Sequence, residues 1–161
     1  LVMSAAAGIR HATAKTATFK QNQPGRRPSA ISLAWARRIE SIQMFTITKQ
    51  FAFSASHQLA GLDADHPCSR LHGHNYIVEV ELRGASLDAR GFVRDYRELG
   101  PLKTMIDDVF DHRHLNDVLG HDHPTAERLA LFFYDWTHDR WPEVTAVRVS
   151  ETPKTWAEYR P

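Results

Sequence analysis

The sequence predicts an α+β fold in which a small, mostly antiparallel sheet carries two helices on one face. Two observations lead to this prediction. From Met44 onward, apolar and polar residues alternate in segments near both ends of the chain, as in half-buried strands. Between those segments, apolar residues recur at helical spacing in two stretches. The resulting order of strands, helices and a final strand is that of an α+β sandwich.

Four strands are expected. The first covers 45–53, and the second covers 75–83 and places its apolar residues on one face. A hairpin connection over 84–90 should lead to a short third strand at 91–94. The fourth strand covers 144–150, and the tail after it shows no further pattern.

Two helices are expected between the third and fourth strands. Apolar residues spaced three and four apart predict the first over 96–110, with Pro101 in its first turn. The second opens at Pro124, where Thr125 is a plausible N-cap and Glu127 suits the positive end of the helix dipole.

Charge divides the chain into two kinds of sequence. Residues 1–43 carry seven Lys/Arg and one Glu, whereas residues 44–161 carry 13 basic and 18 acidic side chains. We expect residues 1–43 to be a basic extension, disordered or not native, and residues 44–161 to be the single functional domain. The extension could be a transit peptide, an arm that contacts nucleic acid, or upstream sequence translated ahead of a start at Met44. The direct entry into strand sequence after Met44 favours the last interpretation.

The strongest functional signal is a histidine pattern, Cys68-Ser-Arg-Leu-His72-Gly-His74, with His57 upstream. In an extended segment, the two histidines of an H-x-H pair lie on one face. A third histidine from a neighbouring strand would complete a three-nitrogen zinc site with an open position, as in catalytic sites. The alternative is a set of surface histidines without metal. Cys68 could be a reactive thiol, a fourth zinc ligand, or a small buried residue.

Five motifs together resemble the 6-pyruvoyl-tetrahydropterin synthase superfamily, and within it the 6-carboxy-tetrahydropterin synthase branch of the queuosine pathway. They run in order from Met44 to Pro161: Phe53-Ser-Ala-Ser-His57, Cys68-x-x-x-His72-Gly-His74-Asn-Tyr76, Phe110-Asp-His-Arg-His-Leu-Asn116, Pro124-Thr-Ala-Glu127 and Ser150-Glu-Thr152. The four-residue step from Cys68 to His72 resembles the carboxy branch more than the mammalian pyruvoyl enzymes.

The resemblance implies a role for each matched residue. It implies that His57, His72 and His74 hold Zn²⁺. It implies that Cys68, Asp111 and His112 are catalytic, with Cys68 as the base and the other two in proton transfer. It implies that Glu151 anchors the pterin, with Thr125 and Glu127 near the same pocket. Helix capping explains Thr125 and Glu127 nearly as well.

The resemblance also implies a tunnelling fold, in which four-stranded antiparallel sheets join around an axis into an oligomeric barrel. The expected oligomer is a homo-oligomer built on a trimer, up to a hexamer, with active sites between subunits. The implied enzyme is a cytoplasmic zinc-dependent lyase. It converts 7,8-dihydroneopterin triphosphate to 6-carboxy-5,6,7,8-tetrahydropterin, triphosphate and acetaldehyde, with no nucleic-acid or membrane partner.

Two other functions remain open at this stage. The same scaffold makes 6-pyruvoyl-tetrahydropterin or cleaves other pteridine side chains in related enzymes. A non-catalytic zinc-binding module would use Cys68 as a fourth ligand.

The single cysteine excludes an intrachain disulfide, and no apolar stretch is long enough to cross a bilayer.

Overall fold

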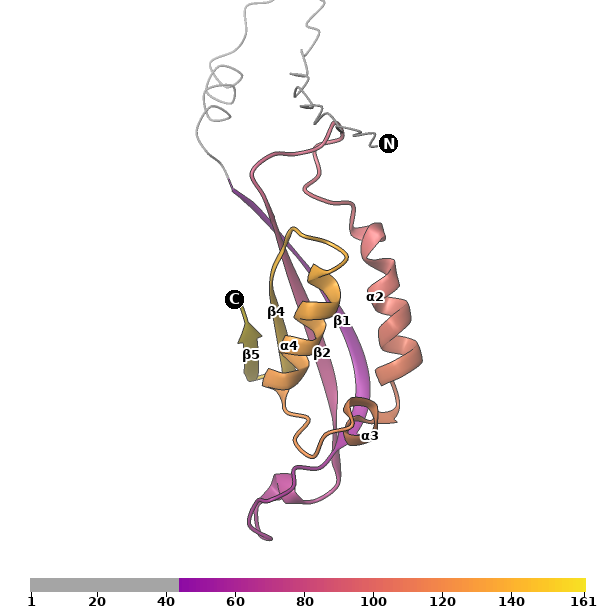
Figure 1. The fold of residues 1–161 in the computed structure, drawn as a ribbon, viewed down its shortest axis with the longest axis vertical. Coiled ribbons are helices and arrows are strands. Elements are labelled where there is room, and N and C mark those ends of the chain that lie inside the picture. The colour runs from indigo at the N-terminus through magenta and orange to yellow at the C-terminus, as the bar shows by residue number, and fades with distance from the viewer. Residues whose placement is uncertain (1–43) are drawn as a thin grey trace, which may run out of the picture. The chain divides into compact units, whose positions relative to one another are not determined.

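A five-stranded sheet organises residues 44–161, the part of the chain that the computed structural model describes (Figure 1). The strand order is β3-β1-β2-β4-β5. The strands are β1 (Phe45–His57), β2 (His72–Gly84), β3 (Arg113–His114), β4 (Val144–Thr152) and β5 (Thr155–Tyr159). The predicted basic extension of residues 1–43 lies outside the described residues.

The long hairpin of β1 and β2 forms the centre of the sheet. Its antiparallel register runs without interruption from Phe45 opposite Gly84 to His57 opposite His72. Both strands therefore extend further than the sequence predicted, and the extra residues include all three histidines of the pattern. The ladder continues through the small residues 54–56, which lie opposite 73–75.

The prediction of four antiparallel strands was wrong in three places. Residues 91–94 form no strand, because the turn before them satisfies its own polar groups: Asp88 Oδ1 accepts the amide hydrogens of Arg90 at 2.8 Å and Phe92 at 2.9 Å. The tail instead supplies β5, which pairs antiparallel with β4. The two-residue β3 runs parallel to β1, so the sheet is mixed.

The first predicted helix is three short segments in sequence. A 3-10 turn (Tyr96–Leu99) leads into α2 (Gly100–Met105), and a π-helical turn (Ile106–Phe110) follows. The short α3 (Leu115–Leu119) comes next, and α4 (Ala126–His138) is the second predicted helix. A further 3-10 turn, Pro67–Ser69, carries Cys68. No helix in residues 44–161 is long and apolar enough to span a membrane.

The helices cover one face of the sheet, as predicted (Figure 1). Residues such as Val78 and Val80 of β2 pack there against Leu102 of α2 and Phe133 of α4, and all four are fully buried. Along β2, these residues alternate with Glu79 and Glu81, which therefore point to the opposite face.

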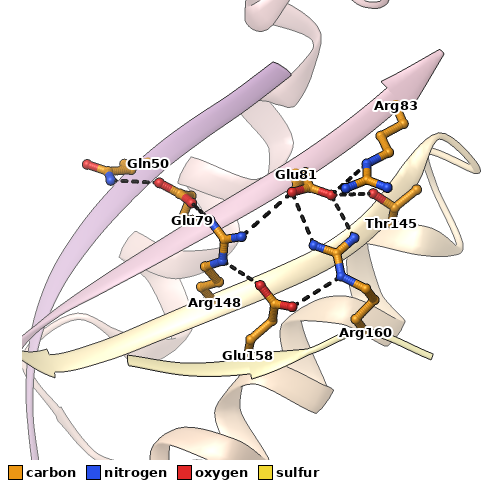
Figure 2. A network of polar contacts seen from close by, with 8 residues as sticks. All are labelled: Gln50, Glu79, Glu81, Arg83, Thr145, Arg148, Glu158 and Arg160. Carbon is orange, nitrogen blue, oxygen red and sulfur yellow. Dashed lines mark hydrogen bonds and ion pairs between the residues drawn. The ribbon is translucent and has the colours of Figure 1, made fainter. Parts of the chain in front are cut away.

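An ion network covers that opposite face (Figure 2). Its side chains come from four strands and the C-terminal tail: Gln50, Glu79, Glu81, Arg83, Thr145, Arg148, Glu158 and Arg160. Arg148 contacts Glu79 at 2.8 Å and Glu158 at 2.6 Å, and Arg160 contacts Glu81 at 2.7 Å. The network therefore connects β5 and the tail to the central strand β2.

Candidate active site

Three histidines meet where the β1–β2 hairpin ends. The register places His57 opposite His72, and His74 follows two residues later on the same face. Their ring centroids lie 4.4 Å (57–72), 5.1 Å (57–74) and 4.9 Å (72–74) apart. One ring nitrogen from each lies within 4.8 Å of the others. The structure thus brings together the three residues predicted to hold a metal.

Hydrogen bonds fix which nitrogens of two of these rings are free. Nδ1 of His57 lies 2.9 Å from the carbonyl oxygen of Pro124, and Nδ1 of His72 lies 2.7 Å from that of Arg70. A carbonyl only accepts, so each Nδ1 must carry a hydrogen. When both rings are neutral, neither Nε2 atom carries a hydrogen. The lone pairs of the two Nε2 atoms then point at each other across 3.0 Å. A cation between them would remove this repulsion, so the donor set fits a metal ion.

The surroundings favour the neutral, ligating form of the His57 and His74 imidazoles. Burial lowers the pKa of His57, and His72 and His74 lower it further, against a smaller rise from the hydrogen bond to Pro124. Burial also lowers the pKa of His74, with a further contribution from His72. Neutral imidazole is the form that binds a metal.

The glycine between the paired histidines has a steric role. A Cβ atom on Gly73 would lie 3.1 Å from the backbone oxygen of Ala55 across the hairpin. Any larger residue would therefore press on β1 next to His57. The pattern H-G-H keeps the two strands close where the three rings converge.

Cys68 and the predicted pterin residues line one cavity of about 320 Å³ beside the histidine cluster. Its lining comprises His57, Leu59, Cys68, Thr125, Ala126, Glu127, Glu151, Thr155, Trp156 and Ala157. The last three belong to β5, the strand that the sequence did not reveal. Burial raises the pKa of Glu151, and the nearby Glu127 raises it further. Thr125 also caps α4, since its side chain accepts from the Arg128 amide at 3.5 Å.

Local contacts hold the Cys68 turn in place. The Cys68 amide donates to Nδ1 of His66 at 3.1 Å, and its carbonyl accepts from the Leu59 amide at 2.9 Å. Cys68 is half-buried and lies outside the three-histidine cluster, the one metal-binding cluster found in residues 44–161. This placement favours a free thiol beside the cluster over a fourth ligand.

Asp111 and His112 form a pair at the outer edge of β1. Asp111 accepts the Ser54 amide hydrogen at 2.9 Å, and its other oxygen lies 2.9 Å from Nδ1 of His112. Neighbouring side chains meet here because His112 has a φ of +56°, in the left-handed region. The Ser54 bond, and then the His112 bond, lower the pKa of Asp111. Both residues were singled out by the sequence motif, and this turned backbone brings their side chains into contact.

Within one chain, however, this pair does not face Cys68. His112 lines a second cavity, of about 470 Å³, together with His74 and His114. Sequence analysis assigned no role to His114, whose Nδ1 lies 3.2 Å from Ser56 Oγ. The only sequence feature that could have pointed to His114 is its position two residues after His112. The predicted catalytic residues therefore divide between two cavities, with the histidine cluster adjoining both.

The chain is similar to known proteins both in sequence and in structure. The model of the family described as 6-pyruvoyl tetrahydropterin synthase matches residues 46–161. A 6-carboxy-5,6,7,8-tetrahydropterin synthase of Bacillus subtilis is 33% identical over 129 residues, covering 73% of this chain and 86% of that protein. A 6-pyruvoyl tetrahydrobiopterin synthase of Dictyostelium discoideum is 32% identical over 127 residues, covering 71% and 94%.

Solved structures show the same similarity. The structure of Caenorhabditis elegans 6-pyruvoyl tetrahydropterin synthase aligns with a TM-score of 0.65 and 26% identity, covering 74% of this chain and 97% of that one. The matched region contains the sheet, the helices and all the residues of both cavities. On these grounds, the chain belongs to the 6-pyruvoyl tetrahydropterin synthase family.

Proposed function

We propose that this chain is a zinc-dependent lyase that converts 7,8-dihydroneopterin triphosphate and one water molecule to 6-carboxy-5,6,7,8-tetrahydropterin, triphosphate and acetaldehyde. The observation that carries the proposal is one cavity that joins Cys68 and Glu151 to the histidine cluster through His57. The 6-carboxy-tetrahydropterin synthases among the relatives support the product. Cytoplasmic queuosine synthesis is the matching setting.

In this proposal, His57, His72 and His74 hold the zinc ion. Three neutral nitrogen ligands are the usual set of a catalytic zinc site and leave a position for substrate. When bound, the metal polarises side-chain oxygens of the substrate and so acidifies the adjacent C–H bonds. The carbonyls of Pro124 and Arg70 keep two of the rings in the ligating orientation.

Cys68 is the proposed base that removes a proton from the activated substrate side chain. It lies on the same cavity as His57 and is exposed enough to meet a ligand. A thiol acts through its thiolate, which a nearby cation stabilises. His112, held by Asp111 at 2.9 Å, is the proposed carrier of protons during triphosphate loss and the later tautomerisation.

Glu151 is the proposed pterin anchor. One carboxylate can accept both the N3–H and the 2-amino N–H of the ring, which gives a planar, bidentate pair. Glu151 lies at the end of β4 and is half-buried in the cavity. A bound pterin ring would therefore shield its carboxylate from water. Glu127 and Thr125 from the start of α4 complete the same wall.

The separation of His112 from Cys68 supports an active site shared between subunits. Each lines a different cavity of one chain, so a second copy would have to bring the missing residue. We therefore propose a trimer-based homo-oligomer, up to a hexamer, in which Asp111 and His112 complete the site of a neighbour.

The deciding experiment is mass spectrometry of the products after the zinc-loaded protein has reacted with 7,8-dihydroneopterin triphosphate. The expected products are 6-carboxy-5,6,7,8-tetrahydropterin and acetaldehyde. A pyruvoyl product would assign the chain to the sister activity, which the Dictyostelium and Caenorhabditis proteins favour by name. Unchanged substrate would instead favour a zinc-binding module without catalysis.

A further inference from the structure

Tyr76 is the one residue in 44–161 whose only polar side-chain atom is buried and has no hydrogen-bond partner. The residue is fully buried. Two other buried atoms lack partners, but they belong to Arg94 and Glu143, which bond each other through their remaining atoms. A buried hydroxyl without a partner makes tyrosine less stable than phenylalanine of the same shape. We therefore looked for a hydrogen-bond acceptor that the Tyr76 hydroxyl could reach when a ligand occupies the Cys68 cavity.

The sheet register places Tyr76 beside Glu151. The paired residues Ile77 of β2 and Ser150 of β4 are opposite each other, so the next step of the antiparallel register brings Tyr76 opposite Glu151. Both lie on the face covered by helices, as do the buried pair Val78 and Val149 two residues further along. Side chains in such directly opposite positions are within reach of each other.

The ring of Tyr76 is held from three sides. It stacks on Phe53 with centroids 5.0 Å apart and an angle of 10°. Its edge contacts with His57 and His74 have centroid distances of 6.0 Å and 5.6 Å. This packing fixes the direction of the hydroxyl and allows it little freedom to turn elsewhere.

Glu151 is a suitable acceptor for that hydroxyl. No side chain within residues 44–161 donates a hydrogen bond to its carboxylate in this structure, although a carboxylate has about four acceptor positions. The groups that face it are Glu127 from α4, His72 from β2 and Cys68 from the turn before β2.

We propose that Tyr76 is a positioning residue for substrate: its hydroxyl donates to the carboxylate of Glu151, directly or through one buried water, when a pterin occupies the cavity. The ring N–H groups then use two acceptor positions of Glu151, and Tyr76 uses a third. This inference rests on the proposed role of Glu151 as the pterin anchor. It adds a residue that holds the anchor ionised and aimed at the ring.

The test is a double-mutant cycle read by binding, with zinc-loaded full-length protein and neopterin as the fluorescent probe. Tyr76→Phe should weaken the Kd for neopterin about tenfold, the effect of one hydrogen bond to a charged group. In a Glu151→Gln background, the same change should cost less than about twofold, because the charged acceptor is gone. Tyr134→Phe, at a buried tyrosine on α4, is the matched control and should leave the Kd unchanged.

Two further measurements separate positioning from structure. The Tyr76→Phe protein should keep its zinc content by elemental analysis and should not lose thermal stability, because the change removes an unpaired buried hydroxyl. The acid limb of neopterin binding should also move to higher pH, because Glu151 would lose a donor that stabilises its ionised form.

Each result decides one claim. If Glu151→Gln weakens binding and Tyr76→Phe does not, the inference is wrong and the anchor assignment stands. If the two changes are additive, Tyr76 acts without Glu151, and the inference is equally wrong. If the zinc-loaded wild type fails to bind neopterin, or Glu151→Gln binds it normally, the anchor assignment fails, and the Tyr76 inference fails with it.

Discussion

At the scale of single residues, the H-x-H pattern and His57 form a cluster whose facing ring nitrogens require a cation or a proton between them. The imidazoles of His57 and His72 each give Nδ1 to a backbone carbonyl, which turns Nε2 of both rings toward the same point. Two lone pairs 3.0 Å apart repel unless a cation or a proton lies between them. The proposed zinc ion therefore meets a set of donors whose hydrogen-bond partners already orient them.

Replacing His72 with alanine should remove the metal. The variant leaves two ligands, so zinc affinity should fall at least about a hundredfold, more than the loss of an outer-shell hydrogen-bond partner costs. Elemental analysis after dialysis against a weak chelator measures this. His121→Ala is the matched control, because His121 lies outside the cluster and should leave zinc content unchanged. Stoichiometric zinc in the His72 variant would contradict the ligand set.

Replacing Cys68 with alanine should abolish turnover and leave zinc in place. Loss of a general base costs about 10² to 10⁴ in rate, whereas the three histidine ligands do not involve Cys68. Steady-state assays and metal analysis of one preparation test both parts. Retained turnover would rule out Cys68 as the base, and simultaneous loss of zinc would show that its sulfur is a ligand.

Much of the site was predictable from the sequence because its residues come in short motifs. His72 and His74 share a face by strand alternation, and the same alternation could have placed Tyr76 beside them. The contact between Asp111 and His112 was harder to predict, because it depends on the left-handed φ of His112, which no sequence pattern indicates. The division of the proposed catalytic residues Cys68 and His112 between two cavities depends on where the chain returns to the sheet, which no local sequence pattern predicts.

At the scale of elements, the ion network attaches β5 to the rest of the sheet (Figure 2). Glu81 is 6% exposed, and hydrogen bonding to Arg160, with further help from Thr145, lowers its pKa to about 2. Arg160 follows β5, and Thr155, Trp156 and Ala157 of that strand line the Cys68 cavity. The network therefore supports a wall of the candidate site from the opposite face.

The network should make stability depend on pH in the acid range. Glu81 has a lower pKa in the folded chain than in the unfolded one, so its contribution is complete above about pH 4.5 and disappears as pH falls toward 2. Glu81→Gln should therefore lower the free energy of unfolding by up to about 3 kcal/mol at pH 7, and by much less near pH 2. Urea unfolding across this range measures the difference.

The control for Glu81 is Glu98→Gln. Glu98 pairs with Arg94 on the surface, and its side chain is 54% exposed, so the change should cost well under 1 kcal/mol at either pH. Equal effects of the two substitutions would contradict a special role for the network.

The tail shows why the strand count was missed. Residues Thr155–Tyr159 are few, and only Ala157 and Tyr159 pack toward the helices, Tyr159 against Tyr134 at a centroid distance of 5.1 Å. Their pairing with β4 is interrupted by a register shift between Val149 and Thr152, which hides the register from pattern analysis. The long hairpin was easier to predict, because alternation persists along both of its strands.

At the scale of the whole molecule, the sheet has open edges. β5 ends the strand order on one side, and β3 covers only Ala55 and Ser56 of β1 on the other. Within residues 44–161, most of β1 therefore has no strand on its outer edge. Open edges in native proteins are usually covered or paired, which agrees with the proposed barrel of several copies.

Mixing two inactive variants should restore activity if the proposed oligomer shares its sites. Cys68→Ala and His112→Ala should each be inactive alone. Unfolded together and refolded as a mixture, they should recover about a quarter of wild-type activity, the chance that two randomly assembled copies give one site both intact residues. No recovery, with oligomers of normal size by light scattering, would place Cys68 and His112 in the same chain's site.

The position of the histidines at the end of the hairpin has a mechanical consequence. A zinc ion shared by His57 and His72 would cross-link the two strands and close the loop between them, which carries Cys68. Closing a loop of this length restricts the unfolded chain by roughly 3 kcal/mol in the entropy model used for disulfides. The metal would thus act as a reversible staple. Chelation should loosen the Cys68 loop before it unfolds the sheet, and faster amide exchange confined to that loop would reveal it.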